Sequence, residues 1–200
     1  MIDIFLGQKN KKVIEKAKKL GFSEVLFVKI IENIKEINKE DAGKFDCCVV
    51  KTKEIEQFRR IIDKSCNIFE KIIVLGTTNE INRLALEHKK VFALLNPEYS
   101  EYREKDYLDS RNSGLNQVLC KIALEGKKKI LVSLDSLRDE KSLGRVIQNF
   151  RLCKKFGTEI QLVNFVSSLD GMKSAFELKE VERVLKNKEH FERESMAKDL

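Results

Sequence analysis

The sequence has 200 residues, of which 42% are hydrophobic and 36% are charged, and its formal net charge is +7. This composition fits one globular domain with a sizeable core and argues against intrinsic disorder. The apolar runs fall short of the roughly 18 residues of a membrane span, and the first is too short for a signal peptide. We therefore expect a cytoplasmic protein without a membrane partner.

Short apolar runs that are typical of buried strands alternate with helical patterns along the first half of the chain. The sequence predicts strands at residues 2–6, 25–28, 47–50, 71–76 and 91–95. Apolar residues at helical spacing predict helices within residues 13–20 and 55–62, and the charged stretch 30–43 predicts a short helix plus a loop. Thr77 and Glu80 have the spacing of a capping box, which predicts that a further helix begins there.

The second half is most informative between residues 111 and 134. Asn112 and Ser113 are good N-cap residues. An apolar stripe at helical spacing follows them, made of Leu115, Val118, Leu119, Ile122 and Ala123. Gly126 is expected to end this helix in the left-handed conformation, before a basic turn and a strand at 130–134. A helix near 143–156, a strand at 160–166 and a last helix capped by Ser174 and Glu177 complete the pattern.

Seven strands that alternate with helix-length segments predict an α/β protein with a parallel sheet covered on both faces. Periodicity alone leaves open whether the sheet closes into a barrel or stays open and doubly wound. We expect one domain over residues 1–186. The charged tail at 187–200 is expected to extend the last helix or to fray.

The segment from 111 to 134 resembles the archaeal ribonuclease P protein component 3 family, which is related to a eukaryotic subunit of the same enzyme. That family has an Arg-x-x-Gly-Leu-x-x-Val-Leu segment, a helix rich in Ala and Lys, and a strand that ends in a polar residue and Leu. The resemblance extends to residues 74–98, 150–168 and 173–185, about half of the chain in total. The residues that match the central motif are Asp109, Arg111, Gly114, Leu115, Val118, Leu119, Lys121, Ser133 and Leu134.

This resemblance implies a TIM-like barrel of about seven parallel strands with outer helices, similar to the polymerase and histidinol phosphatase superfamily. It also implies an RNA-binding subunit of ribonuclease P, the endonuclease that removes the 5′ leader of precursor tRNA. The implied partners are ribonuclease P RNA, precursor tRNA and protein component 2. The catalytic centre would lie in the RNA with its Mg²⁺ ions, so the chain itself would bind no cofactor and carry no catalytic residue.

The residues that usually build catalytic or metal sites are sparse. The five cysteines include no Cys-x-x-Cys pair, and Cys47 and Cys48 are interpreted as small core residues. The two histidines, His88 and His190, lie far apart in the sequence and are interpreted as structural. Phosphate-binding glycine motifs are absent. We therefore expect neither a catalytic nor a metal site.

The positive charge is clustered, which suits a partner that carries phosphates. Residues 1–20 have six lysines against two carboxylates, and residues 107–160 have eleven basic against six acidic residues. Arg111 precedes a helix, so its guanidinium and free amides can converge on one phosphate, or it can pair with Asp109. The candidate RNA-binding residues are Lys11, Lys12, Arg111, Asn112, Lys121, Lys127, Lys128, Arg138, Ser167, Ser168 and Lys173.

Two other classes of function stay open at this point. One is a metal-dependent phosphoesterase or other small-molecule enzyme on a degenerate barrel, which would need a pocket of converging histidines and carboxylates. The other is a protein-interaction module without catalysis or RNA contact, which an even distribution of charge would have favoured.

Overall fold

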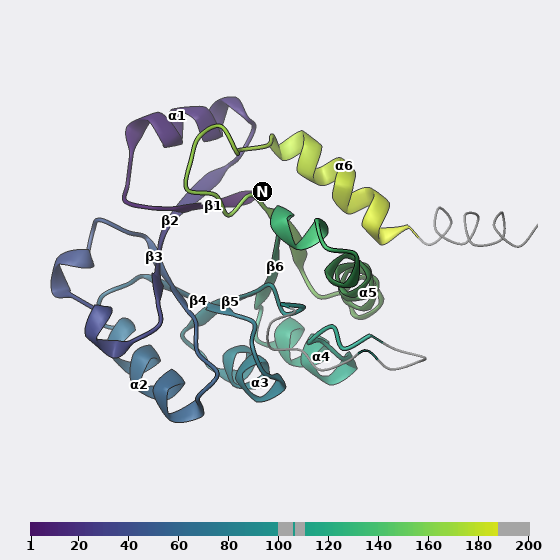
Figure 1. The fold of residues 1–200 in the computed structure, drawn as a ribbon, viewed down its shortest axis with the longest axis horizontal. Helices are drawn as coiled ribbons and strands as arrows, with labels where there is room; N and C mark the ends of the chain where they lie inside the picture. Colours follow the sequence, from purple (N-terminus) through teal and green to yellow (C-terminus); the bar gives the residue numbers. More distant parts are fainter. Residues whose placement is uncertain (100–105, 107–110, 188–200) are drawn as a thin grey trace, which may run out of the picture.

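The computed structural model describes residues 1–99, 106 and 111–187, in which seven parallel strands form one sheet in chain order (Figure 1). Each strand pairs in parallel with the next along the chain. The strands are β1 (Ile2–Leu6), β2 (Glu24–Ile31), β3 (Cys47–Val50), β4 (Lys71–Leu75), β5 (Val91–Leu95), β6 (Lys129–Ser133) and β7 (Ile160–Val163).

Six helices surround the sheet in this part of the chain (Figure 1). Short 3₁₀ turns, η1 (Ile34–Glu36) and η2 (Lys39–Asp41), take the place of a helix between β2 and β3, and η4 (Leu134–Leu137) follows β6. The helices are α1 (Lys11–Lys19), α2 (Ile55–Ser65), α3 (Asn79–Glu87), α4 (Gln117–Glu125), α5 (Glu140–Phe156) and α6 (Ala175–Lys186). None of the helices in the described ranges is long and apolar enough to cross a membrane.

The sheet closes because β1 and the chain just after β7 meet. The amide of Leu6 donates to the carbonyl of Val166 at 2.9 Å, and the Gln161 side chain donates to the carbonyl of Ile2 at 2.5 Å. A parallel bridge also joins Phe5 to Val166. The predicted TIM-like barrel of seven strands is therefore confirmed.

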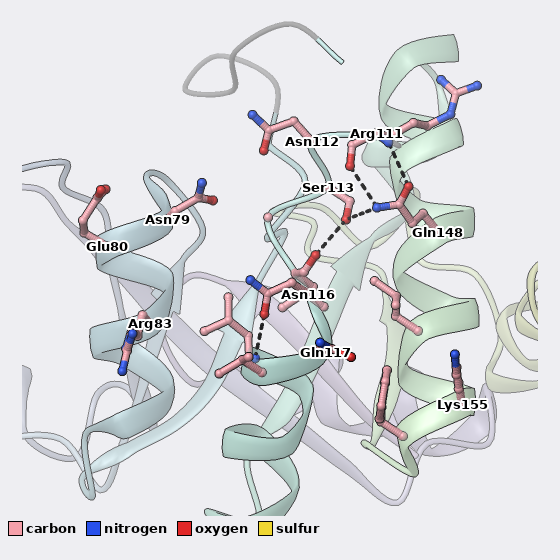
Figure 2. Close-up of a pocket in the computed structure, with 16 residues that line it drawn as sticks. Asn79, Glu80, Arg83, Arg111, Asn112, Ser113, Asn116, Gln117, Gln148 and Lys155 are labelled. Carbon is pink, nitrogen blue, oxygen red and sulfur yellow. Dashed lines mark hydrogen bonds between the residues drawn. The ribbon is translucent and has the colours of Figure 1, made fainter. Parts of the chain in front are cut away.

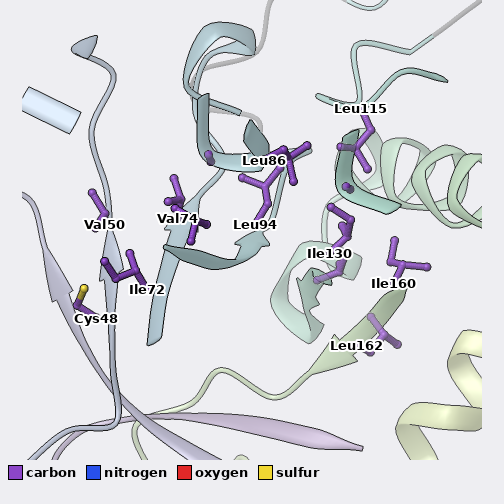
Figure 3. Packing of buried hydrophobic residues seen from close by; sticks show 14 of the residues in the cluster. Cys48, Val50, Ile72, Val74, Leu86, Leu94, Leu115, Ile130, Ile160 and Leu162 are labelled. Carbon is purple, nitrogen blue, oxygen red and sulfur yellow. The ribbon is translucent and has the colours of Figure 1, made fainter. Parts of the chain in front are cut away.

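The barrel is filled with side chains and has two apolar layers. Alternate strand residues point inward and form the inner layer. The others pack against the helices in a larger outer layer, part of which Figure 3 shows. Cys47 lies in the inner layer and Cys48 in the outer layer, where burial raises the pKa of the Cys48 thiol to about 12. Both are core residues, as predicted. The inner layer comprises Ile4, Leu26, Val28, Cys47, Val49, Ile73, Ala93, Leu95, Leu131 and Val163.

Two details of the predicted helix ends are wrong. The cap of α3 is Thr78, because Thr77 is buried and its hydroxyl donates to the carbonyl of Thr52 at 2.7 Å. Gly126 has a right-handed backbone at the end of α4, and Lys127 takes the positive φ of 50° in its place. The Ser174–Glu177 capping box of α6 is confirmed. The tail prediction for 188–200 lies outside the described residues.

Candidate nucleic-acid interface

The carboxyl end of the barrel collects most of the predicted RNA-binding residues. All strands are parallel, so the loops that follow the strands all lie at this end. Barrel proteins have their functional sites at the same end. The residues that lie in these loops, or in the first turn of the helix that follows, are Lys11, Lys12, Arg111, Asn112, Arg138, Ser167, Ser168 and Lys173. The lysines of this group are exposed, and so are both serines and Arg111.

The remaining three candidates lie elsewhere. Lys121 is exposed in the middle of α4, and Lys127 and Lys128 precede β6 at the opposite end of the barrel. The fold therefore separates these lysines from the carboxyl-end group.

Lys128 is a structural residue, which corrects the interpretation of the basic turn. The residue is 8% exposed, and its ammonium donates to the carbonyls of His88, Lys89 and Val91 at 3.0, 3.1 and 2.5 Å. The carbonyls of His88 and Lys89 lie just after α3, and that of Val91 belongs to the first residue of β5. Burial lowers the pKa of Lys128. Its amine faces the protein, so we remove it from the candidate RNA contacts.

The loop that carries Arg111 is held from α5 by one side chain. The Gln148 carboxamide accepts from the amide of Arg111 at 3.0 Å and donates to the carbonyl of Arg111 at 2.9 Å. The same Nε2 atom also donates to the hydroxyl of Ser113 at 3.0 Å. Figure 2 shows these bonds between α5 and the loop. The backbone position of Arg111 is therefore set by α5.

Two buried asparagines hold the next residues of the loop. Asn149 of α5 donates to the carbonyl of Ser113 at 3.0 Å, and Asn82 of α3 donates to the carbonyl of Gly114 at 3.1 Å. Gly114 has a φ of 76°, which glycine adopts without strain. The loop of residues 111–114 is thus held between two helices by hydrogen bonds to the backbone of Arg111, Ser113 and Gly114.

Asp106 adds a carboxylate to the Arg111 loop. One of its oxygens accepts from the amide of Asn112 at 2.8 Å and from Nε of Arg145 at 2.9 Å, while the other lies 3.9 Å from Nη1 of Arg111. Burial opposes ionisation, but the Asn112 amide and the Arg145 guanidinium outweigh it and lower the pKa of Asp106. The alternative partner expected from the sequence, Asp109, lies outside the described residues.

The predicted start of α4 is wrong, and this changes the role expected for Arg111. The cap is Asn116, whose side chain accepts from the amide of Leu119 at 2.9 Å, so the cap lies three residues after Ser113 and the helix begins at Gln117. The Arg111 side chain points away from this helix end and lies against α5 (Figure 2). The guanidinium and the first amides of α4 therefore do not converge on one point.

A groove runs from the Arg111 loop along α5. One part, of about 770 Å³, lies around the start of α4 and is bordered by the first turn of α3 (Figure 2). A second part, of about 430 Å³, continues along α5 and includes Arg151 and Lys155. Sequence reasoning missed both of these residues as binding candidates. The signal was present, because residues 141–156 contain basic residues and no carboxylate.

The described residues, 1–99, 106 and 111–187, contain no group of three or more His, Cys, Asp or Glu side chains that could hold a metal ion. His88 lies just after α3, where its Nδ1 accepts from the amide of Lys90 at 3.3 Å, and burial lowers its pKa. His190 lies outside the described residues.

Comparison with known proteins supplies one relative in sequence. The chain is 29% identical over 124 residues to ribonuclease P protein component 3 of Methanosarcina acetivorans, a match that covers 59% of this chain and 48% of the relative. The chain thus spans about half the length of the curated relative it matches. No family model matches the sequence. The resemblance to the component 3 family that the Arg111 segment indicated is confirmed by this relative.

Solved structures share the fold. A chain in the cryo-EM structure of archaeal ribonuclease P with mature tRNA superposes with a TM-score of 0.69 and 22% identity, covering 92% of this chain and 82% of that one. The crystal structure of an uncharacterized protein superposes with a TM-score of 0.50 and 7% identity, covering 85% and 55%. At these identities the likeness concerns the barrel fold.

Proposed function

We propose that this chain is an RNA-binding protein subunit of ribonuclease P, which assists the catalytic RNA in removing the 5′ leader of precursor tRNA. Its sequence relative is named as a subunit of that enzyme, and its structural neighbour was solved as part of the enzyme with mature tRNA. The match to the relative is partial, so the assignment rests equally on what the site can do.

The observation that carries the proposal is the loop of residues 111–114, whose backbone is held by side chains of α3 and α5. It lies within the segment that resembles the family, and the Gln148 carboxamide and the Asn82 and Asn149 side chains fix its backbone. The Arg111 side chain remains half exposed, at 50%, at the mouth of a groove. A fixed backbone with an exposed guanidinium suits phosphate binding, because arginine donates up to two parallel hydrogen bonds to one phosphate.

The role of the chain in this proposal is phosphate neutralisation and positioning. The basic residues at the carboxyl end, including Lys11, Lys12, Arg138 and Lys173, would contact phosphates of ribonuclease P RNA or precursor tRNA, and Asn112, Ser167 and Ser168 would donate to phosphate oxygens. The catalytic centre and its Mg²⁺ would belong to the RNA, and the chain would assemble with protein component 2. The enzyme would act in the cytoplasm.

The proposal is tested by recovering the chain from extract of its own cells and identifying the RNA bound to it. We expect ribonuclease P RNA, with an affinity for purified transcripts that falls steeply between low and moderate salt. A bound small metabolite without RNA would favour the small-molecule enzyme. An affinity for RNA that is flat with salt would favour the interaction module.

Catalysis by the chain itself is a separate question with its own assay. The purified, RNA-free chain is incubated with precursor tRNA, with and without Mg²⁺. We expect no cleavage unless the RNA subunit is added. Robust cleavage by the chain alone would contradict the proposed division of roles.

A further inference from the structure

The outer face of α5 carries a straight row of positions that begins beside Arg111. Gly144, Gln148, Arg151 and Lys155 follow one another at spacings of four, three and four residues, which places them on one face of the helix. An α-helix rises about 1.5 Å per residue, so Arg151 lies about 10 Å along the axis from Gly144, and Lys155 about 6 Å further. This row forms one side of the groove.

Arg111 completes the row from a different element. A Cβ atom on Gly144 would lie 2.5 Å from Cζ of Arg111, so the guanidinium rests directly on the bare backbone of α5 at that position. Only glycine leaves this space. Arg111, Arg151 and Lys155 therefore form a line of three cations along one helix, which we call the α5 row; Figure 2 shows Arg111 and Lys155 at its two ends.

Two of the three cations of the α5 row, Arg151 and Lys155, have no carboxylate partner within the described part of the chain, and the third, Arg111, lies 3.9 Å from the Asp106 carboxylate. The groove of about 430 Å³ beside it is lined by these three cations, Gly144, Ile147, Gln148 and Leu152, without a carboxylate. Neither Arg151 nor Lys155 forms an ion pair with a described residue, and Nε of Arg151 is buried without a hydrogen-bond partner. By contrast, carboxylates pair with Arg59, Arg83, Arg138, Arg145 and Arg183.

Neighbouring cations without a counter-ion repel one another, and a cleft of one sign of charge concentrates ions of the other sign. A linear row favours a linear polyanion over a single phosphate. Ile147 and Leu152, which line the groove among the cations, offer no hydrogen-bonding side chains that could read base edges. The features on this surface thus suit the backbone of a nucleic acid more than its bases.

We propose that the α5 row binds the phosphodiester backbone of one RNA strand, independently of base sequence, and so extends the Arg111 site along the outside of the barrel. This inference rests on the proposed function, since it takes the partner to be RNA. It adds Arg151 and Lys155 to the interface and makes Gly144 the residue that permits the row to be continuous.

The test measures RNA affinity as a function of salt for the double variant Arg151→Gln/Lys155→Gln. Transcripts of ribonuclease P RNA and of precursor tRNA are used in separate arms, which identify the strand that is bound. The matched control is Lys154→Gln/Lys179→Gln, because these two lysines line a different hollow, between α5 and α6, which also contains Glu182. Thermal melting checks that both variants are folded.

We expect the α5-row variant to bind one of the two RNAs roughly 10-fold or more weakly, as for the loss of charge-assisted hydrogen bonds. The slope of log affinity against log salt should fall by roughly 0.7–0.9 for each cation removed. The control should keep the affinity and slope of the wild type.

Three other outcomes would contradict either the α5 row as an RNA-binding surface or the proposed function. If Arg111→Ala weakens binding but the double variant has the slope of the wild type, the α5 row is not an RNA track, while the proposed function stands. If the double variant keeps RNA binding but fails to assemble with protein subunits of the enzyme, the groove is a protein interface and the inference is wrong. If the wild type binds neither RNA in a salt-dependent way, the proposed function itself fails.

Discussion

The side chain of Gln148 holds both backbone polar groups of Arg111, accepting from its amide at 3.0 Å and donating to its carbonyl at 2.9 Å. A carboxamide matches a peptide unit in this way because it has one acceptor and one donor side by side. The relationship places a residue of the loop after β5 in a fixed position on α5, 37 positions away in the sequence. It leaves the guanidinium of Arg111 available for a ligand.

The two hydrogen bonds between Gln148 and the backbone of Arg111 can be removed by one substitution. Gln148→Leu removes three hydrogen bonds to the loop at a partly exposed site, so the free energy of unfolding should fall by about 1–3 kcal/mol. RNA affinity should fall as well, because Arg111 loses its fixed backbone. Denaturant unfolding and RNA titration measure the two effects. Gln117→Leu, at an exposed position of α4, is the matched control for stability and should leave the free energy of unfolding unchanged.

Gly144→Ala is expected to separate stability from binding. A Cβ at this position would lie 2.5 Å from Cζ of Arg111, but that atom is near the end of a flexible side chain that can swing away. Alanine is also favoured over glycine within a helix by up to about 1 kcal/mol. We therefore expect an unchanged or higher melting temperature together with weaker RNA binding. A variant that binds as tightly as the wild type would show that the guanidinium does not act from this place.

The fold was predictable from sequence because the alternation of apolar runs with helical segments determines a parallel sheet. Barrel closure was not predictable from that pattern, since it depends on contacts such as the bond from the Leu6 amide to the Val166 carbonyl. The family resemblance supplied it. The predicted start of α4 was wrong because Asn112, Ser113 and Asn116 are all good N-cap residues. Hydrogen bonds from α5 and α3 to the carbonyls of Ser113 and Gly114 decide which of them caps the helix, and these bonds form only in the folded chain.

Among the binding candidates, those whose position depends on topology were predicted correctly, and those whose role depends on tertiary contacts were not. Residues after strands, such as Arg111 and Lys173, were placed at one end of the barrel by topology that the sequence predicts. Lys128 was misinterpreted, because local sequence does not reveal that its ammonium reaches carbonyls at the end of α3. Arg151 was missed because its significance depends on Gly144 and Arg111, which meet only in the folded chain.

Lys128→Met should destabilise the fold without changing the affinity for RNA. The substitution removes the donor that serves three carbonyls, so we expect the free energy of unfolding to fall by about 1–3 kcal/mol. Lys127→Met, at the exposed neighbouring position, should change it by about 0.5 kcal/mol or less. Weaker RNA binding by folded Lys128→Met, with Lys127→Met unchanged, would restore Lys128 as a contact and contradict its structural role.

Asp3 gives a prediction for the dependence of stability on pH. The carboxylate is fully buried at the seam of the barrel, where it accepts from the amide and the side chain of Asn164 at 2.7 and 2.6 Å. Burial raises its pKa above the ordinary value of 3.8, although the bonds from Asn164 act in the opposite direction. The folded chain therefore holds this proton to a higher pH than the unfolded chain does.

It follows that this group makes the free energy of unfolding fall as the pH rises from about 3.8 through the raised pKa. Other carboxyls titrate in the same range, so the measurement is the difference in unfolding free energy between the wild type and Asp3→Asn. The wild type should lose stability relative to the variant as the pH rises through this window. A relative gain would mean that the bonds from Asn164 outweigh burial.

The central claim is that this chain is a ribonuclease P subunit that binds RNA phosphates through Arg111, and Arg111→Ala tests it most directly. The carboxylate of Asp106 is 3.9 Å away and the Arg111 side chain is half exposed, so the free energy of unfolding should change by less than about 1 kcal/mol. The decisive measurement is the affinity of this variant for ribonuclease P RNA and precursor tRNA, made together with its unfolding free energy. We predict a loss of roughly 1–3 kcal/mol in RNA binding with stability preserved. A clear loss of stability with RNA affinity unchanged would contradict the account.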